Sequence, residues 1–465
     1  MKYFKLFFFI TLVSFLSSCA CGFKYINTNV PMYAPKSDFI KKIKTIKPKE
    51  INNAGKIYLY KNFIFVHEKD AGVHIIDNTD IKNPKNIVFL RIPFSTDISI
   101  KDNILYADMF NDLISIDIND INNIKILKIN ENIFEKDNVS IDETVEIGYK
   151  TIKTEYIPVF CGEVPLSLQP KANNGLEFYE PSSPEITPRD YSNNYKNTEI
   201  GGSLARFSII EDYLYVLSSS VEMIIYNLQN TPDLKEENTI KIGSELETIF
   251  PYDNKLFLGS KTRMYVYDNE NKTKPKFLSS FQHIKSCDPV VVENKKAYVT
   301  LRGGGITCNS SNNELDIVNI EDIKNPKLIR AYPMKNPSGL AIKNNILYLC
   351  DGVEGLKIFD VSNSNDINLI KTIPINNPKD IILNENDHAI IISQEGLFQY
   401  DFSNLKKENL ELSKILIKES NLKNDNVRVE QIKIKNPEIL LQKNLDLKQG
   451  GKVFYYNWYE KYFLE

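Results

Sequence analysis

The sequence has few residues of the kinds that metal sites and nucleophilic active sites require. It contains four histidines (His67, His74, His283 and His388), of which only the first two lie close together. A metal site needs several ligands at suitable spacing. There is no G-x-S-x-G motif, and "RGGG" at 302–305 lacks the Lys-Ser/Thr that completes a phosphate-binding loop. We therefore assign no catalytic residue, metal or cofactor, and an enzyme is the less favoured interpretation.

An excess of charge of one sign is also absent. Lys and Arg number 57 and Asp and Glu number 60, so the formal net charge is −3. This balance indicates neither a nucleic-acid partner nor an acidic tail. Long hydrophobic runs are limited to Leu6–Leu16, which is shorter than the ~20 apolar residues of a comfortable membrane span.

The apolar run has the layout of an export signal. Lys2 and Lys5 precede it, and Ser17-Ser18-Cys19 follow it, which gives the basic, apolar and small-residue regions in order. The ending "LSSC" resembles the lipobox of bacterial lipoproteins. That resemblance implies lipidation of Cys19; an ordinary signal peptide with a chance cysteine nearby is the alternative.

On this interpretation residues 1–18 are a lipoprotein signal peptide and residues 19–50 are a tether. The lipid would anchor the mature chain to a membrane without threading it through the bilayer. We expect a location in the bacterial cell envelope. Because Ala20 does not resemble the usual inner-membrane retention signal, the outer membrane is favoured.

The six cysteines follow from the same interpretation. Lipidation of Cys19 leaves five, and an odd number leaves at least one thiol free or paired between chains; Cys21 is the expected odd one. Cys287 and Cys308 are the disulfide candidate. The pairing of the remaining two, at positions 161 and 350, stays open.

A repeat organises most of the chain. An apolar run ending in "LY" or "LF" is followed by a polar break and an alternating run that closes on Asp or Asn. The spacing of the closing residues is about 40, apart from one insertion of about ten residues and one of about seventy. The closing residues are Asp77, Asp117, Asn227, Asp268, Asn319, Asp360 and Asp401.

Each of the seven copies contains four strand-like stretches, as in "TDISI", "ILYAD", "LISIDI" and "IKILKI". The period and the strand number predict an all-β, seven-bladed β-propeller of four-stranded blades at 51–416, with a β-sandwich array as the alternative. Residues 131–202 are predicted to be a loop inserted between blades 2 and 3, and residues 417–465 a C-terminal extension. The predicted blades are 51–92, 96–130, 203–243, 246–284, 287–334, 337–375 and 378–416.

The segment "DIKNPK" occurs twice, at 80–85 and 322–327. Both copies lie between the third and fourth strands of a predicted blade. Asp and Asn side chains close turns on their own backbone, and Pro needs no ladder hydrogen bond there. We interpret the duplication as turn chemistry rather than as a calcium loop.

The repeats resemble a known family. "GVHIIDNTDIKNP", "LISIDINDINN", "ELDIVNIEDIKNP" and "GLKIFDVSNSND" are similar to the LVIVD-repeat β-propeller lipoproteins of bacteria, as are "LARFSI", "ETIFP", "CDPVVV", "AYVTLR" and "CDGVEGLKIFD" in the same order. The resemblance covers roughly residues 50–416 and implies a seven-bladed propeller on a lipid tether. It implies no established activity. The insertion and the tail depart from the family pattern.

Aligned copies place polar or charged residues where each innermost strand begins. Loops converge there on the axis, so a ligand-binding rim is predicted. Arg206 and Arg302 would hold an anion, and Asp97, Asp288 and Asp351 would accept from hydroxyls or amines. Mutual pairing of these charges around the channel and a catalytic carboxylate pair are the alternatives. The full predicted rim is Lys56, Asp97, Arg206, Glu247, Asp288, Arg302, Asp351 and Asp380.

We therefore expect a membrane-anchored envelope lipoprotein whose propeller binds or scaffolds an envelope protein or a glycan, in an oligomeric state that the sequence leaves open. The alternative is an envelope glycan hydrolase or lyase at the channel mouth. Such an enzyme would place two carboxylates ~5–9.5 Å apart.

Overall fold

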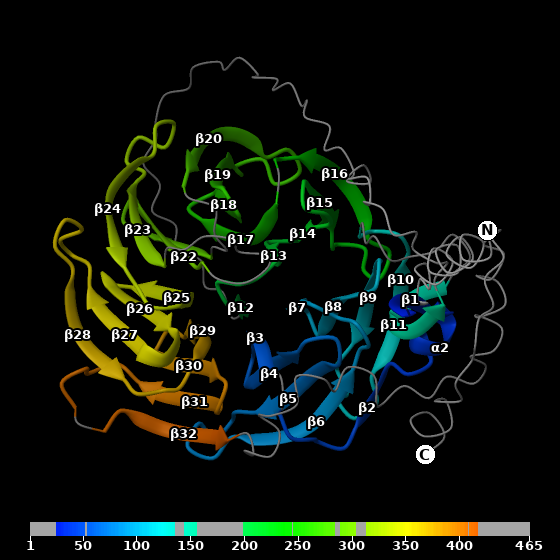
Figure 1. Cartoon of the computed structure of the whole chain (residues 1–465). Helices are drawn as coiled ribbons and strands as arrows, with labels where there is room; N and C mark the ends of the chain where they lie inside the picture. Colours follow the sequence, from blue (N-terminus) through cyan, green and yellow to red (C-terminus); the bar gives the residue numbers. More distant parts are fainter. Residues whose placement is uncertain are drawn as a thin grey trace, which may run out of the picture. The chain divides into compact units, whose positions relative to one another are not determined.

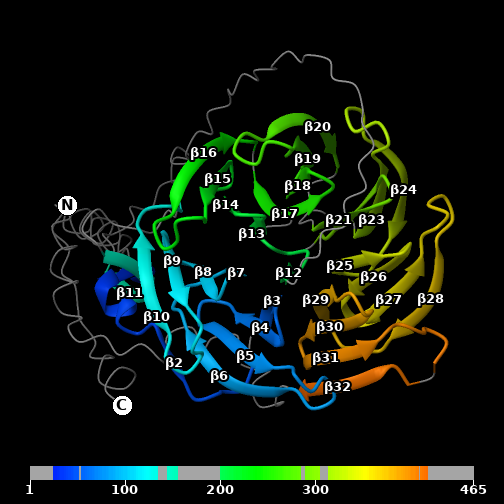
Figure 2. The same cartoon turned by 180° about the vertical axis from the view of Figure 1, so that it is seen from behind.

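The computed structural model describes residues 25–51, 54–134, 144–155, 199–243, 245–283, 289–303, 313–407 and 409–416. They fall into two compact units. The smaller unit contains most of β1 (Tyr25–Pro35) and β11 (Thr144–Glu155), which pair in a two-stranded sheet. The larger unit contains a ring of seven sheets around a central axis, seen in Figure 1 and from behind in Figure 2.

The seven sheets are the blades of a β-propeller, and each is built on four antiparallel strands that are consecutive in the sequence; the sheet of blade 1 is extended by β12 (Glu199–Gly201) and β2 (Lys44–Ile46). The first strand of a blade lies nearest the axis and the fourth lies at the periphery (Figure 1). The predicted fold is thereby confirmed. Blades 1 to 4 are β3 (Ala54–Tyr60), β4 (Phe63–Glu68), β5 (Gly72–Asp77), β6 (Lys85–Arg91); β7 (Ile98–Lys101), β8 (Ile104–Met109), β9 (Asp112–Asp117), β10 (Lys125–Asn130); β13 (Phe207–Ile210), β14 (Tyr213–Leu217), β15 (Glu222–Asn227), β16 (Lys235–Lys241); and β17 (Leu246–Tyr252), β18 (Lys255–Ser260), β19 (Arg263–Asp268), β20 (Lys276–Gln282). Blades 5 to 7 are β21 (Val290–Glu293), β22 (Lys296–Leu301), β23 (Glu314–Asn319), β24 (Lys327–Pro333); β25 (Pro337–Lys343), β26 (Ile346–Asp351), β27 (Leu356–Asp360), β28 (Asn368–Ile373); and β29 (Pro378–Leu383), β30 (His388–Ser393), β31 (Gly396–Asp401), β32 (Glu411–Leu416).

Burial follows the position of a strand within its blade. Second and third strands such as β8 and β9 are buried along nearly their whole length, because the neighbouring blades cover both faces of the sheet. Fourth strands such as β10 and β28 alternate or are exposed. The apolar clusters accordingly lie between successive blades, for example between blades 3 and 4 around Leu217, Leu256 and Leu258.

The turns between third and fourth strands have the predicted chemistry. In blade 1 the N–H of Thr79 donates to Oδ1 of Asp77 (2.9 Å), and the N–H of Lys82 donates to Oδ1 of Asp80 (3.1 Å). The first of these bonds recurs at the equivalent Asp or Asn of all seven blades. Each side chain satisfies its own backbone two residues on, so the interpretation of "DIKNPK" as a repeated turn is confirmed.

The ring closes between blades 7 and 1 through side chains. Ile57 and Ile64 of blade 1 pack against Ile382 and Ile390 of blade 7. The amide groups of Asn78 and Gln399 donate to each other at 3.1 and 2.7 Å, across 321 residues of sequence.

Two predicted regions contain regular structure that the sequence interpretation did not assign. The predicted tether includes β1, the helix α2 (Lys36–Ile40) and β2 (Lys44–Ile46). The predicted inserted loop includes β11 and β12 (Glu199–Gly201). The alternating apolar residues of "TVEIGYKTIKTE" could have identified β11. No helix among the described residues is long and apolar enough to cross a bilayer.

The segment 35–46 attaches to blades 1 and 2. The ring of Phe39, a fully buried side chain, packs against the rings of Phe94 and Phe110 at centroid distances of 5.5 and 5.1 Å. Lys36 forms an ion pair with the buried Asp112. Further along, β2 pairs antiparallel with β6 and becomes an additional outer strand of blade 1.

Candidate functional site at the propeller axis

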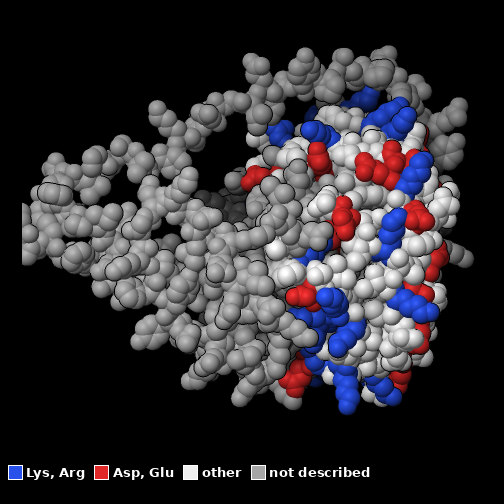
Figure 3. Space-filling model, turned by 90° about the vertical axis from the view of Figure 1, so that its right-hand side faces the viewer, with Lys and Arg blue, Asp and Glu red and all other residues white. Residues whose placement is uncertain are grey.

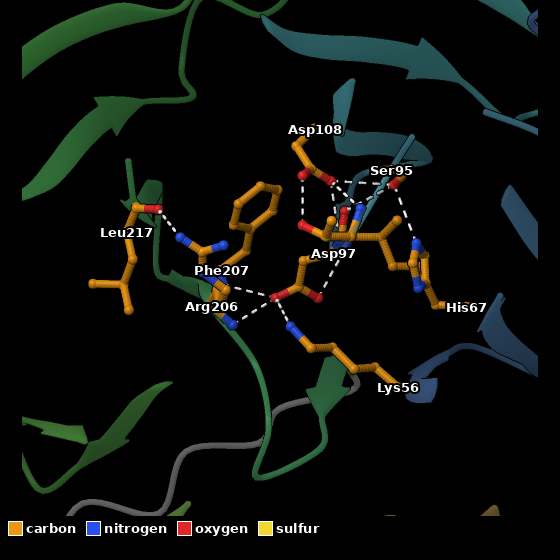
Figure 4. A network of polar contacts seen from close by, with 10 residues as sticks. Lys56, His67, Ser95, Asp97, Asp108, Arg206, Phe207 and Leu217 are labelled. Carbon is orange, nitrogen blue, oxygen red and sulfur yellow. Dashed lines mark hydrogen bonds and ion pairs between the residues drawn. The ribbon is translucent and has the colours of Figure 1, made fainter. Parts of the chain in front are cut away.

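The innermost strands bring three predicted rim residues close to one another at the axis. Asp380 lies in β29 opposite Ile392, Lys56 lies in β3 and Asp97 comes directly before β7, so three successive blades around the ring contribute one ionisable group each. Nζ of Lys56 lies 2.8 Å from Oδ2 of Asp97 (Figure 4). The positive charge of Lys56 also acts on Asp380, where it opposes the larger rise in pKa that burial causes.

A segment of the chain itself occupies the axis. β12 pairs antiparallel with β3 on the inner side of blade 1, and residues 202–206, here called the axial segment, continue from it. The N–H of Gly202 donates to the carbonyl of Ile57 in blade 1 (3.3 Å), and the carbonyl of Ala205 accepts from the N–H of Ile249 in blade 4 (2.9 Å). The inserted region therefore returns to blade 3 through the centre of the ring.

Asp97 holds the end of the axial segment. Its Oδ2 accepts hydrogen bonds from the backbone N–H groups of Arg206 (2.5 Å) and Phe207 (3.3 Å), and its Oδ1 accepts from the N–H of Ile98 (2.9 Å). The Arg206 side chain points toward blade 3, where Nη2 donates to the carbonyl of Leu217 at 3.1 Å (Figure 4). Asp97 and Arg206 thus meet through the Arg206 backbone rather than through its guanidinium.

Asp380 holds the start of the axial segment. Its carboxylate is fully buried, and Oδ1 accepts from the hydroxyl of Ser203 (3.2 Å) and the N–H of Ile381 (3.0 Å). Oδ2 has no hydrogen-bond partner among the described residues. A Cβ built on Gly202 would lie 1.9 Å from Oδ2, and one built on Gly339 would lie 2.4 Å from Oδ1. Only residues without side chains permit this packing.

The burial of Asp380 has an electrostatic consequence. Desolvation raises the pKa of its carboxyl to about 7, although the bonds from Ile381 and Ser203 and the charge of Lys56 act in the opposite direction. A desolvated carboxylate is unfavourable unless it is fully paired. Asp380 therefore exchanges its proton near neutral pH while it contacts the axial segment.

A second layer of buried polar groups positions the loop that carries Asp97. Asp108 accepts from the N–H groups of Thr96 (2.6 Å) and Asp97 (2.9 Å) and from the hydroxyl of Ser95 (3.2 Å). The Ser95 hydroxyl is 3.2 Å from Nε2 of His67 (Figure 4). Burial lowers the pKa of His67, against the attraction of Asp108 and Asp97, so the imidazole is neutral. Ser95 lies between His67 and Asp108, which is not the order of an acyl-transfer triad, in which the acid orients the histidine.

The other described rim residues lie in blades 4 to 6. Asp351 is fully buried; its Oδ1 accepts from the N–H groups of Lys335 and Asn336 (2.8 Å each), and its Oδ2 pairs with Lys357 at 2.6 Å. Glu247 in β17 and Arg302 after β22 are half-buried. The partners of Asp351 belong to its own blade and the loop before it rather than to the group formed by Lys56, Asp97 and Asp380, so the structure joins only part of the predicted rim by direct bonds.

Several predicted residues lie outside the described part of the chain, namely Asp288, Cys19, Cys287 and Cys308. Cys350 is described and is a free, buried thiol, and desolvation raises its pKa well above the usual value. Within the described ranges no group of three or more His, Cys, Asp or Glu side chains is arranged to hold a metal ion.

The sequence interpretation missed Gly202, Ser203 and Gly339, which surround Asp380. The run "GGS" at 201–203 was a usable signal, because adjacent glycines mark close backbone approach. It did not identify the partner, since Ser203 and Asp380 are 177 residues apart.

Fold and site together define a seven-bladed propeller in which a segment of the chain itself bonds to the inner strands. No protein-family model matches the sequence, and no curated protein matches it significantly. Among solved structures it is similar to a protein of Lactobacillus plantarum (10% identity, TM-score 0.46, covering 78% of this chain and 97% of that one). It is also similar to a periplasmic gluconolactonase of Pseudomonas aeruginosa (9%, 0.46, 78% and 96%) and to BamB of Moraxella catarrhalis (7%, 0.44, 81% and 95%). At these identities the likeness concerns the fold alone.

Proposed function

We propose that the protein is a membrane-anchored envelope lipoprotein whose propeller is a rigid binding or scaffolding module. The observation that carries this proposal is the position of the axial segment against the inner strands. The polar groups that could handle a small substrate there, Asp97 and Asp380, are bonded to the axial segment. A macromolecular partner that contacts the surrounding loops needs no open channel. The anchor is supported by the resemblance of "LSSC" to a lipobox.

The enzyme alternative has one observation in its favour, the raised pKa of Asp380, since a carboxyl with a pKa near neutral is suited to general acid catalysis. The packing of Asp380 opposes it. Even a Cβ built on Gly202 would lie only 1.9 Å from its free oxygen, so a glycan oxygen could reach it only after the axial segment moved. The binding module is therefore the better supported function.

Anchoring is tested by expressing the full chain in a bacterial host with a labelled fatty acid. We expect label in the protein and recovery in the membrane fraction, and neither label nor signal-peptide processing in Cys19→Ser. A wild-type chain that is processed but carries no label would refute the anchor.

The recognition face is tested by cross-linking in envelope preparations. Glu247→Ala with Arg302→Ala removes one half-buried acidic and one half-buried basic residue of the predicted rim, and Glu270→Ala with Lys274→Ala is a charge-matched control on the exposed turn between β19 and β20. We expect the first pair alone to lose cross-linked partners. Unchanged partners would rule out this face. Glycan cleavage that disappears in Asp380→Asn would favour the enzyme.

A further inference from the structure

Positive charge is concentrated in the segment that attaches the N-terminal side of the chain to blade 1. Five lysines occur between positions 41 and 49, in "KKIKTIKPK". Two of them have acidic partners: Lys49 pairs with Glu68 at 3.1 Å, and Lys41 lies 3.5 Å from Asp38. Lys44 and Lys47 are exposed and add positive charge to this edge of the propeller.

The β2–β6 pairing brings cations together. Lys44 is directly opposite Arg91 in the antiparallel register, and like charges in that position destabilise a strand pair. Lys42 is near the same arginine. Burial lowers the pKa of Lys42, Asp38 opposes this effect and the charge of Arg91 adds to it. The fold thus holds three positive groups close together at one end of β2.

The charge at this edge is available to a partner. Lys44 and Lys47 are exposed and Arg91 is half-buried, and none of the three forms an ion pair with an acidic residue of the described chain. Figure 3 shows the side of the molecule that carries α2 and β10, where blue and red side chains are interspersed on the surface. We call Lys42, Lys44, Lys47 and Arg91 the basic patch.

We propose that the basic patch binds the surface of an anionic lipid bilayer and orients the propeller edge-on to the membrane. This inference rests on the proposed lipid anchor, because the patch begins 23 residues after Cys19 in the sequence. One acyl chain gives only marginal, reversible binding, and a cluster of basic residues is an effective second determinant. Anionic headgroups would also relieve the repulsion between Lys44 and Arg91.

The expected contribution is measurable. A lysine or arginine near an anionic bilayer contributes about 1 kcal/mol, which is roughly a fivefold change in affinity for each residue. Neutralising Lys44, Lys47 and Arg91 should therefore weaken binding by about 100-fold if the three effects add. The interaction should also weaken with salt, since exposed charges are screened.

The test uses the mature chain from residue 19 with Cys19→Ser, made without lipid. Its co-sedimentation is measured with phosphatidylcholine vesicles with and without phosphatidylglycerol. We expect binding only to the vesicles with phosphatidylglycerol, and its loss in the Lys44→Gln, Lys47→Gln, Arg91→Gln variant. The control is Lys274→Gln, Lys276→Gln, Lys327→Gln, which removes the same charge from exposed positions of blades 4 and 5 and should bind as the unchanged protein does.

Three outcomes would overturn the inference: no dependence on phosphatidylglycerol, equal losses in both triple variants, or full competition by inorganic phosphate, which would indicate a site for small anions. Matching thermal unfolding of the two variants ensures that a loss of binding is not a loss of fold. Because the chain carries no lipid here, failure of the basic patch is distinguishable from failure of the anchor, which the fatty-acid label reports.

Discussion

Asp380→Asn tests the axial site most directly, because it removes the ionisable group and keeps the shape. In the native protein desolvation raises the pKa of Asp380 from 3.8 to about 7. The native state therefore binds this proton more tightly than the unfolded chain does. As pH rises from about 4 to about 7, the unfolded chain loses this proton more readily than the native protein, so the free energy of unfolding falls. Above about pH 7 the total loss is about 4 kcal/mol. Below about pH 4 the group is protonated in both states and contributes nothing.

The asparagine variant should lose this pH dependence. Its carbonyl can still accept from Ser203 and Ile381, as Oδ1 does now. Between about pH 5 and about pH 8 the free energy of unfolding of the unchanged protein should fall by about 2 to 3 kcal/mol relative to the variant. Urea unfolding followed by circular dichroism at both pH values measures the difference.

Asp316→Asn is the matched control. Burial raises the pKa of Asp316 to about 6, helped by Glu314 and opposed by His283. Between about pH 5 and about pH 8 the free energy of unfolding of the unchanged protein should therefore fall by only about 1 kcal/mol relative to Asp316→Asn. Most of this fall should occur at a lower pH than the fall caused by Asp380. If Asp380→Asn differs from the unchanged protein by the same amount at every pH, Asp380 does not titrate in the native state and the account of the axis is wrong.

Three further predictions concern the packing of the ring. Gly202→Ala should lower the free energy of unfolding by about 1 to 3 kcal/mol, whereas Gly55→Ala, whose Cβ would meet nothing closer than 3.6 Å, should have little effect; equal urea midpoints would contradict the close approach at the axis. A double-mutant cycle on Asn78→Ala and Gln399→Ala should give a coupling of about 0.5 to 3 kcal/mol in urea unfolding, and zero coupling would show that this pair does not close the ring. Phe39→Ala should cost about 3 to 5 kcal/mol and expose the segment around it to limited proteolysis; unchanged cleavage would show that the segment is held by other contacts.

The number of blades and the turn chemistry could be predicted because both are local. An aspartate such as Asp77 bonds to the N–H of Thr79, two residues away, and this pattern repeats in each copy. Alternating apolar residues indicate strands, and a period near 40 residues indicates blades, without knowledge of any distant contact. Alignment of the copies also predicted that Lys56 and Asp97 begin neighbouring inner strands.

The partners at the axis could not be predicted. The alignment placed Arg206 on the rim as an anion-binding side chain, whereas its backbone N–H is the group that meets Asp97. It gave no sign that the chain returns through the ring, because β12 has only three residues and lies at the end of the long insertion. The basic run 41–49 was visible, but its position beside Arg91 depends on the pairing of β2 with β6.

The sequence by itself thus determined the repeating unit, its turns and the number of its copies, since these depend on the turns and on pairing between strands that are consecutive in the sequence. Only the tertiary structure decided that the axial segment packs against Asp380 and that Asp380 is desolvated there. The fold brings Gly202 and Ser203 against a carboxylate 177 residues away from Ser203, and the pKa of a group depends on everything that surrounds it in space.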